Sequence, residues 1–452
     1  MVDPARQAAY ETVAAVHRDD AYANLALPRI LRELRVHGRD AAFATELTYG
    51  TLRMSGTLDA IVAVAAGREV SRIDPPIRDA LRLGAYQLLH MRVSPHAAVF
   101  STVDLVRSVA GPSATGFANA VLRRIGDRPW DDWIAEVAPD PEADRLGYLA
   151  VAYAHPPWIV RAFAEALGAE ALGAEALGGE DPQDLLAADN TPAPVHLCAR
   201  PGRISAAELA DQAGGEPGRY SPYAVYLPGG APGDLPAIAD GRAHVQDEGS
   251  QLVALALATA ELAGPDQRWL DLCAGPGGKA ALLGALAAQR GARLHAVEVA
   301  PHRAALVEEA VRGLPVTVEV GDGREIEATG FDRVLVDAPC SGLGALRRRP
   351  ESRWRRQPSD LPPLTRLQRE LLVAAFGAVR PGGLVGYVTC SPHRVETEVS
   401  VGEARRRSTI AVEPVDVRPL MPPDVGTGPA AQLWPHRHGT DAMYLALLRR
   451  TD

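Results

Sequence analysis

Two of the chain's four cysteines stand directly after apolar segments that are typical of buried strands. Cys340 follows the segment FDRVLVDAP and Cys390 follows GLVGYVT, and a serine comes after each cysteine, with a proline close by. A single buried cysteine is most often a small core residue. Two cysteines that end two different strands in the same way instead indicate a chemical site.

Two thiols near a carboxylate suit covalent catalysis on a pyrimidine ring. Carbon 5 of cytosine is a poor nucleophile, but a thiolate that adds to carbon 6 makes carbon 5 enamine-like, so that it accepts a methyl group. Asp337, if protonated or sharing a proton, can stabilise the adduct near ring nitrogen 3. The second thiol, directly or through water, can assist loss of the carbon 5 proton and release of the enzyme. The residues alone do not decide which cysteine attacks.

A glycine-rich turn, CAGPGGK at 273–279, ends an apolar strand and begins a helix. Glycine lets a ligand approach the backbone, and the free N–H groups at the start of a helix attract polar or negative groups. The spacing fits neither the phosphate loop GxxxxGK[ST] nor the dinucleotide motif GxGxxG. A nucleoside with a charged amino-acid tail, such as S-adenosylmethionine, is the alternative ligand. Lys279 is the only lysine among 47 basic residues, which favours a specific role for its ammonium group.

Two acids end the next two apolar strands. Glu298 is placed to accept both hydroxyls of a ribose, because a carboxylate accepts two donors. Asp322, in the turn GDG, can accept the amino group of an adenine. The residues expected to bind the methyl donor are Cys273, Ala274, Gly275, Pro276, Gly277, Gly278, Lys279, Glu298, Arg303, Asp322 and Asp337.

These motifs lie in the last of three expected parts of the chain. Residues 1–128 carry a net charge of +3 and repeat apolar residues at helical spacing, which predicts an all-α domain. Residues 129–245 predict an acidic linker with a small α+β subdomain. Residues 246–452 alternate strands with helices and predict an α/β domain with a doubly wound parallel sheet. Ligands bind such sheets at the carboxyl ends of the strands, where every motif above falls.

The motifs resemble those of the NOL1/NOP2/Sun family of RNA cytosine-C5 methyltransferases, in particular its bacterial ribosomal RNA branch. CAGPGGK at 273–279 is similar to the family's donor loop, and DAPCSGLG at 337–344 and VTCSP at 388–392 are similar to its two cysteine motifs. HVQDEGSQLVA at 244–254 resembles its lead-in segment. RDAAFATELTYGTLRM at 39–54 resembles part of an N-terminal domain with the fold of the antitermination factor NusB.

The resemblance implies roles that the residues alone leave open. In this family the nucleophile is the cysteine of the TCSP motif, which implies that Cys390 attacks and that Cys340 assists product release. The resemblance also implies a Rossmann-like catalytic domain, S-adenosylmethionine as the cofactor and small-subunit ribosomal RNA as the substrate. Two alternatives stay open, namely methylation of transfer RNA and a non-catalytic module that binds RNA or regulates transcription.

An arginine-rich segment directly follows the first cysteine motif. Residues 347–356 hold six arginines, one glutamate and one tryptophan. Arginine clusters beside an aromatic ring suit phosphate contact and base stacking. The residues expected to contact RNA are Arg347, Arg348, Arg349, Arg353, Trp354, Arg355, Arg356 and, from the acidic middle part, Arg200.

The composition excludes several other classes of protein. With 47% apolar residues and a net charge of −9, the chain is neither disordered nor coated in basic charge. Four scattered cysteines predict neither a disulfide framework nor a metal site. There is no signal-peptide pattern and no apolar run long enough to span a membrane, so we expect a cytoplasmic protein with no membrane partner. A tandem AEALG repeat at 164–178 is typical of an expanded surface loop or helix end.

Overall fold

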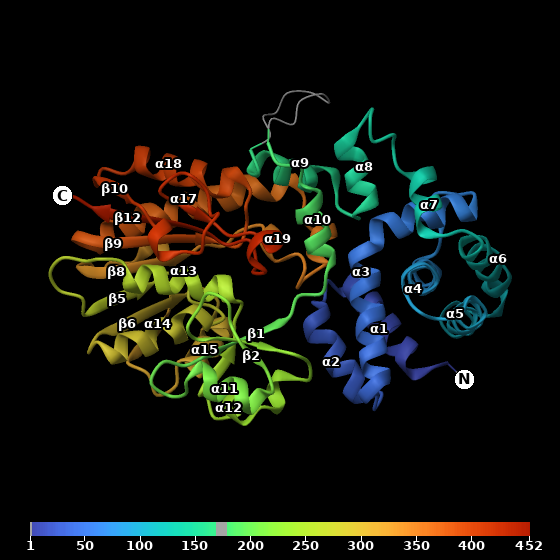
Figure 1. Ribbon diagram of the computed structural model, residues 1–452, viewed down its shortest axis with the longest axis horizontal. Helices are drawn as coiled ribbons and strands as arrows, with labels where there is room; N and C mark the ends of the chain where they lie inside the picture. The colour runs from blue at the N-terminus through green and yellow to red at the C-terminus, as the bar shows by residue number, and fades with distance from the viewer. Residues whose placement is uncertain (1, 169–178) are drawn as a thin grey trace. The chain divides into compact units, whose positions relative to one another are not determined.

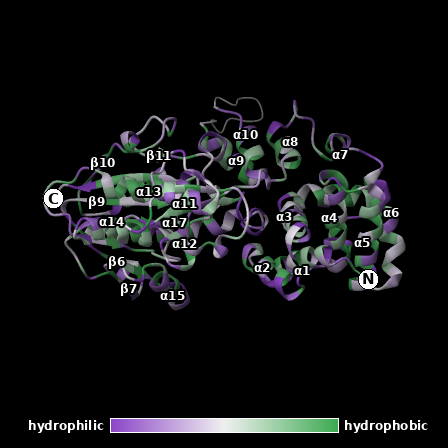
Figure 2. Ribbon diagram, turned by 60° about the horizontal axis from the view of Figure 1, so that its bottom comes forward, coloured by the Kyte–Doolittle hydropathy of each residue, from purple (hydrophilic) through white to green (hydrophobic). Residues whose placement is uncertain are grey.

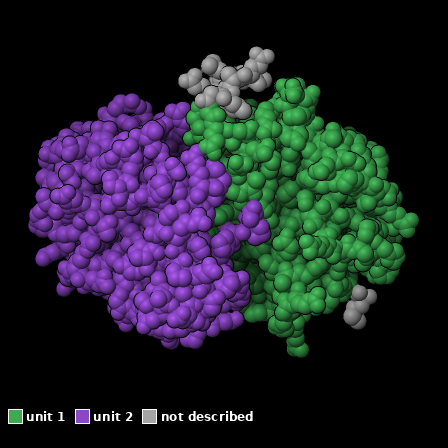
Figure 3. Space-filling model, viewed as in Figure 1, with its two compact units in different colours: residues 1–190, 346–356 green, residues 191–345, 357–452 purple. Residues whose placement is uncertain are grey.

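The computed structural model describes residues 2–168 and 179–452 (Figure 1). Contacts divide the chain into two compact units, which Figure 3 colours separately. Unit 1 is Met1–Asn190 with Leu346–Arg356, and unit 2 is Thr191–Ala345 with Gln357–Asp452. The AEALG copies at 169–178 lie outside the described residues.

This division differs from the three parts expected from the sequence. The helices within residues 130–190 group with the N-terminal helices, whereas the strands within residues 195–245 group with the large sheet. The shift to acidic composition near residue 129 is therefore not a boundary between compact units. Charge lies mainly on the surface, so it does not report the core against which a helix packs.

Unit 1 is helical, and for residues 1–128 the spacing of the apolar residues predicts this. Helices α3 (Gly38–Ala66) and α4 (Pro75–His90) supply several of its fully buried side chains, among them Leu47, Leu58 and Leu81. The other elements of unit 1 are α1 (Pro4–Asp19), α2 (Ala23–Glu33), η1 (Val70–Arg72), α5 (Pro95–Ala110), η2 (Pro112–Ala114), α6 (Thr115–Gly126), α7 (Trp130–Val137), α8 (Arg145–Ala152), α9 (Pro157–Ala166), α10 (Gln183–Asn190) and α16 (Ser352–Arg355).

Unit 2 contains a small antiparallel sheet with the strand order β2-β3-β1-β4. Strands β1 (Val195–Ala199) and β3 (Ala224–Leu227) pair with each other and belong to the part for which the sequence predicts a small α+β subdomain. The other elements of this part are α11 (Ala206–Ala213), β2 (Glu216–Pro217), η3 (Pro232–Asp234), α12 (Pro236–Ala239) and β4 (Ala243–Val245).

The large sheet of unit 2 has the strand order β10-β12-β9-β8-β5-β6-β7, with β11 beside β12. The chain runs outward from β5 through β6 and β7, then returns to β8 and β9, and all pairs among these five strands are parallel. This is the doubly wound arrangement that the sequence predicts. The antiparallel pairing of β12 with β9 and β10 was not predicted.

The strands of the large sheet are β5 (Arg268–Asp271), β6 (Arg293–Glu298), β7 (Val316–Val320), β8 (Phe331–Asp337), β9 (Val379–Thr389), β10 (Val412–Val415), β11 (Ala431–Gln432) and β12 (Tyr444–Arg450). The helices and 3-10 turns around it are α13 (Glu248–Thr259), α14 (Gly278–Gln289), α15 (Pro301–Ala310), η4 (Gly323–Glu325), η5 (Leu343–Ala345), η6 (Pro358–Asp360), α17 (Leu361–Ala378), η7 (Arg394–Glu396), α18 (Glu398–Arg407), η8 (Arg418–Leu420) and α19 (Pro435–His438).

Helices cover both faces of the large sheet (Figure 1). Apolar residues of α13, α14 and α15 join one core beside the strands, and those of α17 and α18 join a second core on the other face. Figure 2 shows hydrophobic residues gathered along β9 and α13. Within the ranges that the structure describes, no helix is both long and apolar enough to cross a membrane.

Candidate active site

The two cysteine motifs meet at the carboxyl ends of neighbouring strands. β8 ends at Asp337, which lies opposite Val388 of the parallel strand β9. The Sγ atoms of Cys340 and Cys390 are 3.4 Å apart, which suits an S–H···S hydrogen bond and is too long for a disulfide. The N–H of Gly344 donates to the carbonyl oxygen of Cys390 and joins the two loops.

The contact between the sulfur atoms makes the two thiols unequal. The hydrogen bond from Cys340 lowers the pKa of Cys390 below its ordinary value, against the effect of burial, and the charge of Lys279 acts in the same direction. The same contact and burial raise the pKa of Cys340 well above its ordinary value. Cys390 is therefore the more acidic of the two thiols, and a thiolate is the nucleophilic form of cysteine.

The only lysine of the chain pairs with the carboxylate at the end of β8. Lys279 Nζ lies 2.8 Å from Asp337 Oδ2, and the lysine side chain is 11% exposed. Burial lowers the pKa of Lys279, but the attraction of Asp337 outweighs burial and raises that pKa above its ordinary value. The ammonium group therefore stays charged, and it connects the glycine-rich turn to the cysteines.

The glycine-rich turn joins β5 to α14, as predicted. Gly277 has a φ of +108°, which side chains rarely allow, and α14 begins at the next residue. Asp271, at the end of β5, is fully buried, and its Oδ1 accepts the N–H of Cys273. Burial, and then the charge of Asp337, raise the pKa of Asp271 to about 7.

These residues fit a methyl donor with a positively charged tail. Asp271 Oδ2 is buried and has no hydrogen-bond partner among the described residues. Such an oxygen is costly unless a ligand supplies a donor, and the ammonium group of S-adenosylmethionine is one. A Cβ atom at Gly275 would lie 2.3 Å from Glu298 Oε2, so glycine is needed for the turn to approach that carboxylate.

Glu298 lies at the end of β6 and is engaged with the turn. Its Oε2 accepts the N–H of Gly275 and its Oε1 accepts the N–H of Ala300, both at 3.0 Å. Arg303 donates to the carbonyl oxygen of Gly275 at 2.5 Å. Glu298 and Arg303 therefore hold the turn in place. Contact of Glu298 with a ribose stays a prediction. Each carboxylate oxygen has a second lone pair that can accept a ribose hydroxyl.

Asp322 follows β7 and is paired within the chain. Its carboxylate accepts the backbone N–H of Arg324 at 2.9 Å and the guanidinium of the same residue at 2.6 Å. The hydrogen bond from this guanidinium lowers the pKa of Asp322. Contact of Asp322 with an adenine stays a prediction. In such a contact the carboxylate would accept from both Arg324 and the amino group of the base.

The arginine-rich segment belongs to unit 1, and part of it is buried there. Arg353 is fully buried, and its Nη1 donates to the carbonyl oxygens of Arg53 and Ala154. Trp354 donates from Nε1 to the carbonyl oxygen of Leu52 at 2.8 Å. The structure therefore corrects the expectation that Arg353 contacts RNA, because its guanidinium binds backbone inside unit 1. The ring of Trp354 is half-buried, and its contact with RNA stays a prediction.

Burial also removes Arg200 and Arg347 from the expected RNA contacts. Arg200 is 5% exposed and donates to the carbonyl oxygen of Ala310, and Arg347 is 7% exposed. Arg355 is half-buried and donates to backbone carbonyls of unit 1, including that of Val16 at 3.0 Å. Of the other arginines of the segment, Arg349 is exposed, and Arg348 and Arg356 are half-buried.

Two residues beside the cysteines escaped the sequence analysis. Glu396 of η7 is fully buried, and its carboxylate accepts from Ser341 and Ser391, the serines that follow the cysteines. Gln368 of α17 donates to the same carboxylate. The repeated Cys-Ser pair was the available signal, because two buried hydroxyls need an acceptor.

Comparison with known proteins covers both ends of the chain. The family model described as "16S rRNA methyltransferase RsmB/F" matches residues 258–449, which include the glycine-rich turn and both cysteine motifs. The family model described as "NusB family" matches residues 3–127, the part of unit 1 that holds α1 to α6.

Relatives match along most of the chain. A Mycobacterium tuberculosis protein named "Putative methyltransferase" is 56% identical over 99% of this chain and 97% of its own length. The "Ribosomal RNA small subunit methyltransferase B" of Escherichia coli O6:K15:H31 is 32% identical over 83% of this chain and 84% of its own. The crystal structure of PH0851 shares the fold, with a TM-score of 0.79 and 22% identity over 99% of each chain. The chain therefore belongs to the RsmB/F family of S-adenosylmethionine-dependent ribosomal RNA methyltransferases.

Proposed function

We propose that this methyltransferase modifies carbon 5 of a cytosine in small-subunit ribosomal RNA. In this proposal Cys390 is the nucleophile and Cys340 assists release. The observation that supports it best is the 3.4 Å contact between the two sulfur atoms, beside the pair of Lys279 and Asp337. Methyl transfer to a ring nitrogen or an oxygen needs no thiol, whereas transfer to carbon 5 needs a nucleophile at carbon 6.

The residues of the chain divide the reaction among them. The thiolate of Cys390 forms a bond to carbon 6, and Asp337 with its lysine partner stabilises the charge that develops near ring nitrogen 3. Carbon 5 then takes the methyl group, which S-adenosylmethionine supplies as an electrophile. Cys340, directly or through water, assists removal of the carbon 5 proton. The electron pair of that C–H bond restores the ring double bond, and Cys390 leaves as a thiolate.

The same proposal assigns RNA contact to a smaller set of arginines than the sequence predicted. Arg349 is exposed, and Arg348 and Arg356 are half-buried, in the segment that follows the Cys340 motif. Arginine suits this role because its guanidinium binds phosphate through two parallel hydrogen bonds.

The substrate is tested by mapping 5-methylcytosine at nucleotide resolution. The purified protein is incubated with S-adenosylmethionine and either small-subunit ribosomal RNA or transfer RNA. We expect one cytosine of the ribosomal RNA to be converted and transfer RNA to stay unmodified. Conversion of transfer RNA alone would show that the substrate is transfer RNA and not ribosomal RNA. Failure to bind S-adenosylmethionine in a calorimeter would favour the non-catalytic RNA-binding alternative.

The roles of the two cysteines are tested by separate substitutions. We expect Cys390→Ser to abolish methylation and Cys340→Ala to accumulate a covalent protein–RNA adduct on a denaturing gel. The control is Cys198→Ala, because Cys198 is a free, fully buried thiol in β1. Full turnover by Cys390→Ser would show that the nucleophile has been assigned to the wrong residue.

A further inference from the structure

One buried carboxylate joins the loops that carry the two cysteines. Glu396 Oε2 accepts from Ser341 Oγ at 2.5 Å and from Ser391 Oγ at 2.7 Å, and the two hydroxyl oxygens lie 3.1 Å apart. Glu396 Oε1 accepts the backbone N–H of Ser341 at 2.8 Å. All three side chains are almost completely buried. The two Cys-Ser motifs, which are 50 residues apart in sequence, thus share one acceptor.

Neighbouring elements hold this carboxylate in place. Gln368 of α17 donates from Nε2 to Glu396 Oε1 at 3.1 Å and to the carbonyl oxygen of Pro339 at 2.9 Å. Tyr387 of β9 donates its hydroxyl to the backbone carbonyl of Glu396 at 2.7 Å. A buried network whose members are all satisfied is rigid and specifies a single arrangement.

We propose that Glu396 is the positioning residue that keeps Cys340 and Cys390 in contact, by binding the serine that follows each cysteine. A serine hydroxyl held at a fixed point restricts the adjacent cysteine, because only one peptide unit separates the two α-carbons. Ser341 and Ser391 are held at the same oxygen, so the two sulfur atoms are brought to one place. The catalytic use of that contact rests on the function proposed above.

The carboxylate of Glu396 also affects the pKa of Cys340. The negative charge of Glu396 contributes to the raised pKa of Cys340, after the contact with Cys390 and burial. A protonated Cys340 can donate to the sulfur of Cys390. The other groups whose charges act on Cys390 are Lys279 at the start of α14, Asp337 at the end of β8 and Asp441 before β12.

The test uses the full chain without RNA or S-adenosylmethionine, so that it does not depend on the proposed reaction. The rate of Cys390 alkylation by iodoacetamide is measured against pH, with the modified cysteine identified by mass spectrometry. We expect Glu396→Gln and the double substitution Ser341→Ala with Ser391→Ala to slow Cys390 alkylation at pH 7 by about tenfold. This corresponds to a rise of about one unit in the pKa of that thiol.

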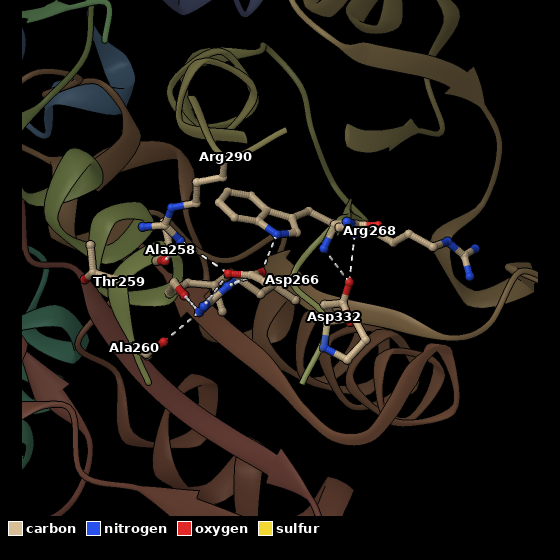
Figure 4. A network of polar contacts seen from close by, with 12 residues as sticks. Ala258, Thr259, Ala260, Asp266, Arg268, Arg290 and Asp332 are labelled. Carbon is tan, nitrogen blue, oxygen red and sulfur yellow. Dashed lines mark hydrogen bonds and ion pairs between the residues drawn. The ribbon is translucent and has the colours of Figure 1, made fainter. Parts of the chain in front are cut away.

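The matched control is Asp332→Asn, at the start of β8, whereas the cysteine motif follows its end. Asp332 is also a buried carboxylate, and it accepts the backbone N–H of Arg268 (Figure 4), the backbone N–H of Gln267 and the guanidinium of Arg380. We expect this variant to lose stability as the Glu396 variant does, but to keep the wild-type profile of Cys390 alkylation. Equal slowing in Asp332→Asn, or an unchanged profile in Glu396→Gln, would overturn the proposal.

Methylation assays on the same proteins separate this inference from the proposed function. We expect Glu396→Gln to lower kcat for RNA methylation at least tenfold while the affinity for S-adenosylmethionine stays within twofold of wild type. A wild-type protein that methylates no cytosine, but whose Cys390 reactivity depends on Glu396, would contradict the proposed function and leave the positioning role standing.

Discussion

At the scale of single residues, the site consists of ionisable groups whose charges depend on one another. Lys279 pairs with Asp337, and the charges of both residues act on the thiol of Cys390. An opposite charge close by favours the ionised form of a group. The thiolate of Cys390 therefore depends on a lysine that lies 111 positions earlier in the sequence.

Lys279→Met is expected to make Cys390 less reactive at neutral pH. The lysine charge lowers the pKa of Cys390, so removal of the lysine raises that pKa. At neutral pH a smaller fraction of Cys390 is then present as the thiolate. In an alkylation experiment the midpoint of the Cys390 profile should move to higher pH. Arg293→Met, an exposed cation at the start of β6, is the control and should leave the midpoint unchanged. A midpoint that does not move in Lys279→Met would contradict the electrostatic coupling.

Asp271→Asn is expected to stabilise the ligand-free protein and to weaken its binding of S-adenosylmethionine. Burial raises the pKa of Asp271 to about 7, so the carboxyl group destabilises the fold increasingly as pH rises from its unfolded value, near 4, to about 7. The difference in unfolding free energy between variant and wild type should grow over this range by about 1.4 kcal/mol per pH unit and then level off. Urea unfolding at several pH values measures it, and a constant difference would contradict the raised pKa.

At the scale of elements, the site depends on how β5 turns into α14. Gly277 has a positive φ, and a Cβ atom there would lie 2.7 Å from the Cβ of Ala310 on α15. A side chain at this position is opposed both by the backbone conformation and by the neighbouring helix. Glycine at this position therefore permits the close packing of the turn against α15.

Gly277→Ala is expected to cost about 1–3 kcal/mol of unfolding free energy and to weaken S-adenosylmethionine binding. The control is Gly377→Ala, since Gly377 lies in α17 with no atom within 4 Å of an added Cβ. That substitution should stabilise the protein by about 0.5 kcal/mol, because alanine loses less backbone entropy in a helix. Chemical unfolding and calorimetry measure both effects. Equal stability of the two variants would show that the turn tolerates a side chain.

At the scale of the whole molecule, a segment from the catalytic part of the sequence is built into the helical unit. Residues 346–356 lie between β8 and α17 in the chain, but they pack within unit 1. Gly56 of α3 makes room for this segment, since an added Cβ would lie 2.2 Å from the ring of Trp354. The core of unit 1 is thus completed by residues more than 150 positions beyond its last N-terminal helix.

Trp354→Ala is expected to destabilise unit 1 by up to about 3 kcal/mol, because the indole packs against its core and bonds to Leu52. The dependence of RNA affinity on salt concentration should stay the same, because the uncharged indole neutralises no phosphate. Arg349→Ala provides the contrast: its exposed charge should lower the slope of log affinity against log salt by about one, with little loss of stability. A folded Trp354→Ala variant that binds RNA much more weakly with an unchanged slope would show that the tryptophan stacks on a base.

Much of the fold and the centre of the site follow from local sequence patterns. Apolar segments that alternate with helices predicted the five parallel strands, and parallel strands bring their carboxyl ends to one edge of a sheet. For that reason the sequence alone predicts that Cys340 and Cys390 lie together, with Asp337 and the turn that ends at Lys279 beside them. These predictions needed only strand ends, which apolar runs and the residues after them mark directly.

Burial and hydrogen-bond partners were decided by the tertiary structure alone. The arginine-rich segment looks like a charged surface in sequence, yet Arg353 is buried, and carbonyl oxygens of residues distant in sequence accept its N–H groups. Glu396 shows no local pattern, because its role arises only where the two Cys-Ser loops converge. Local sequence determines where strands and turns lie. The partner of a buried polar group depends on residues that are far apart in the chain, and only packing brings them together.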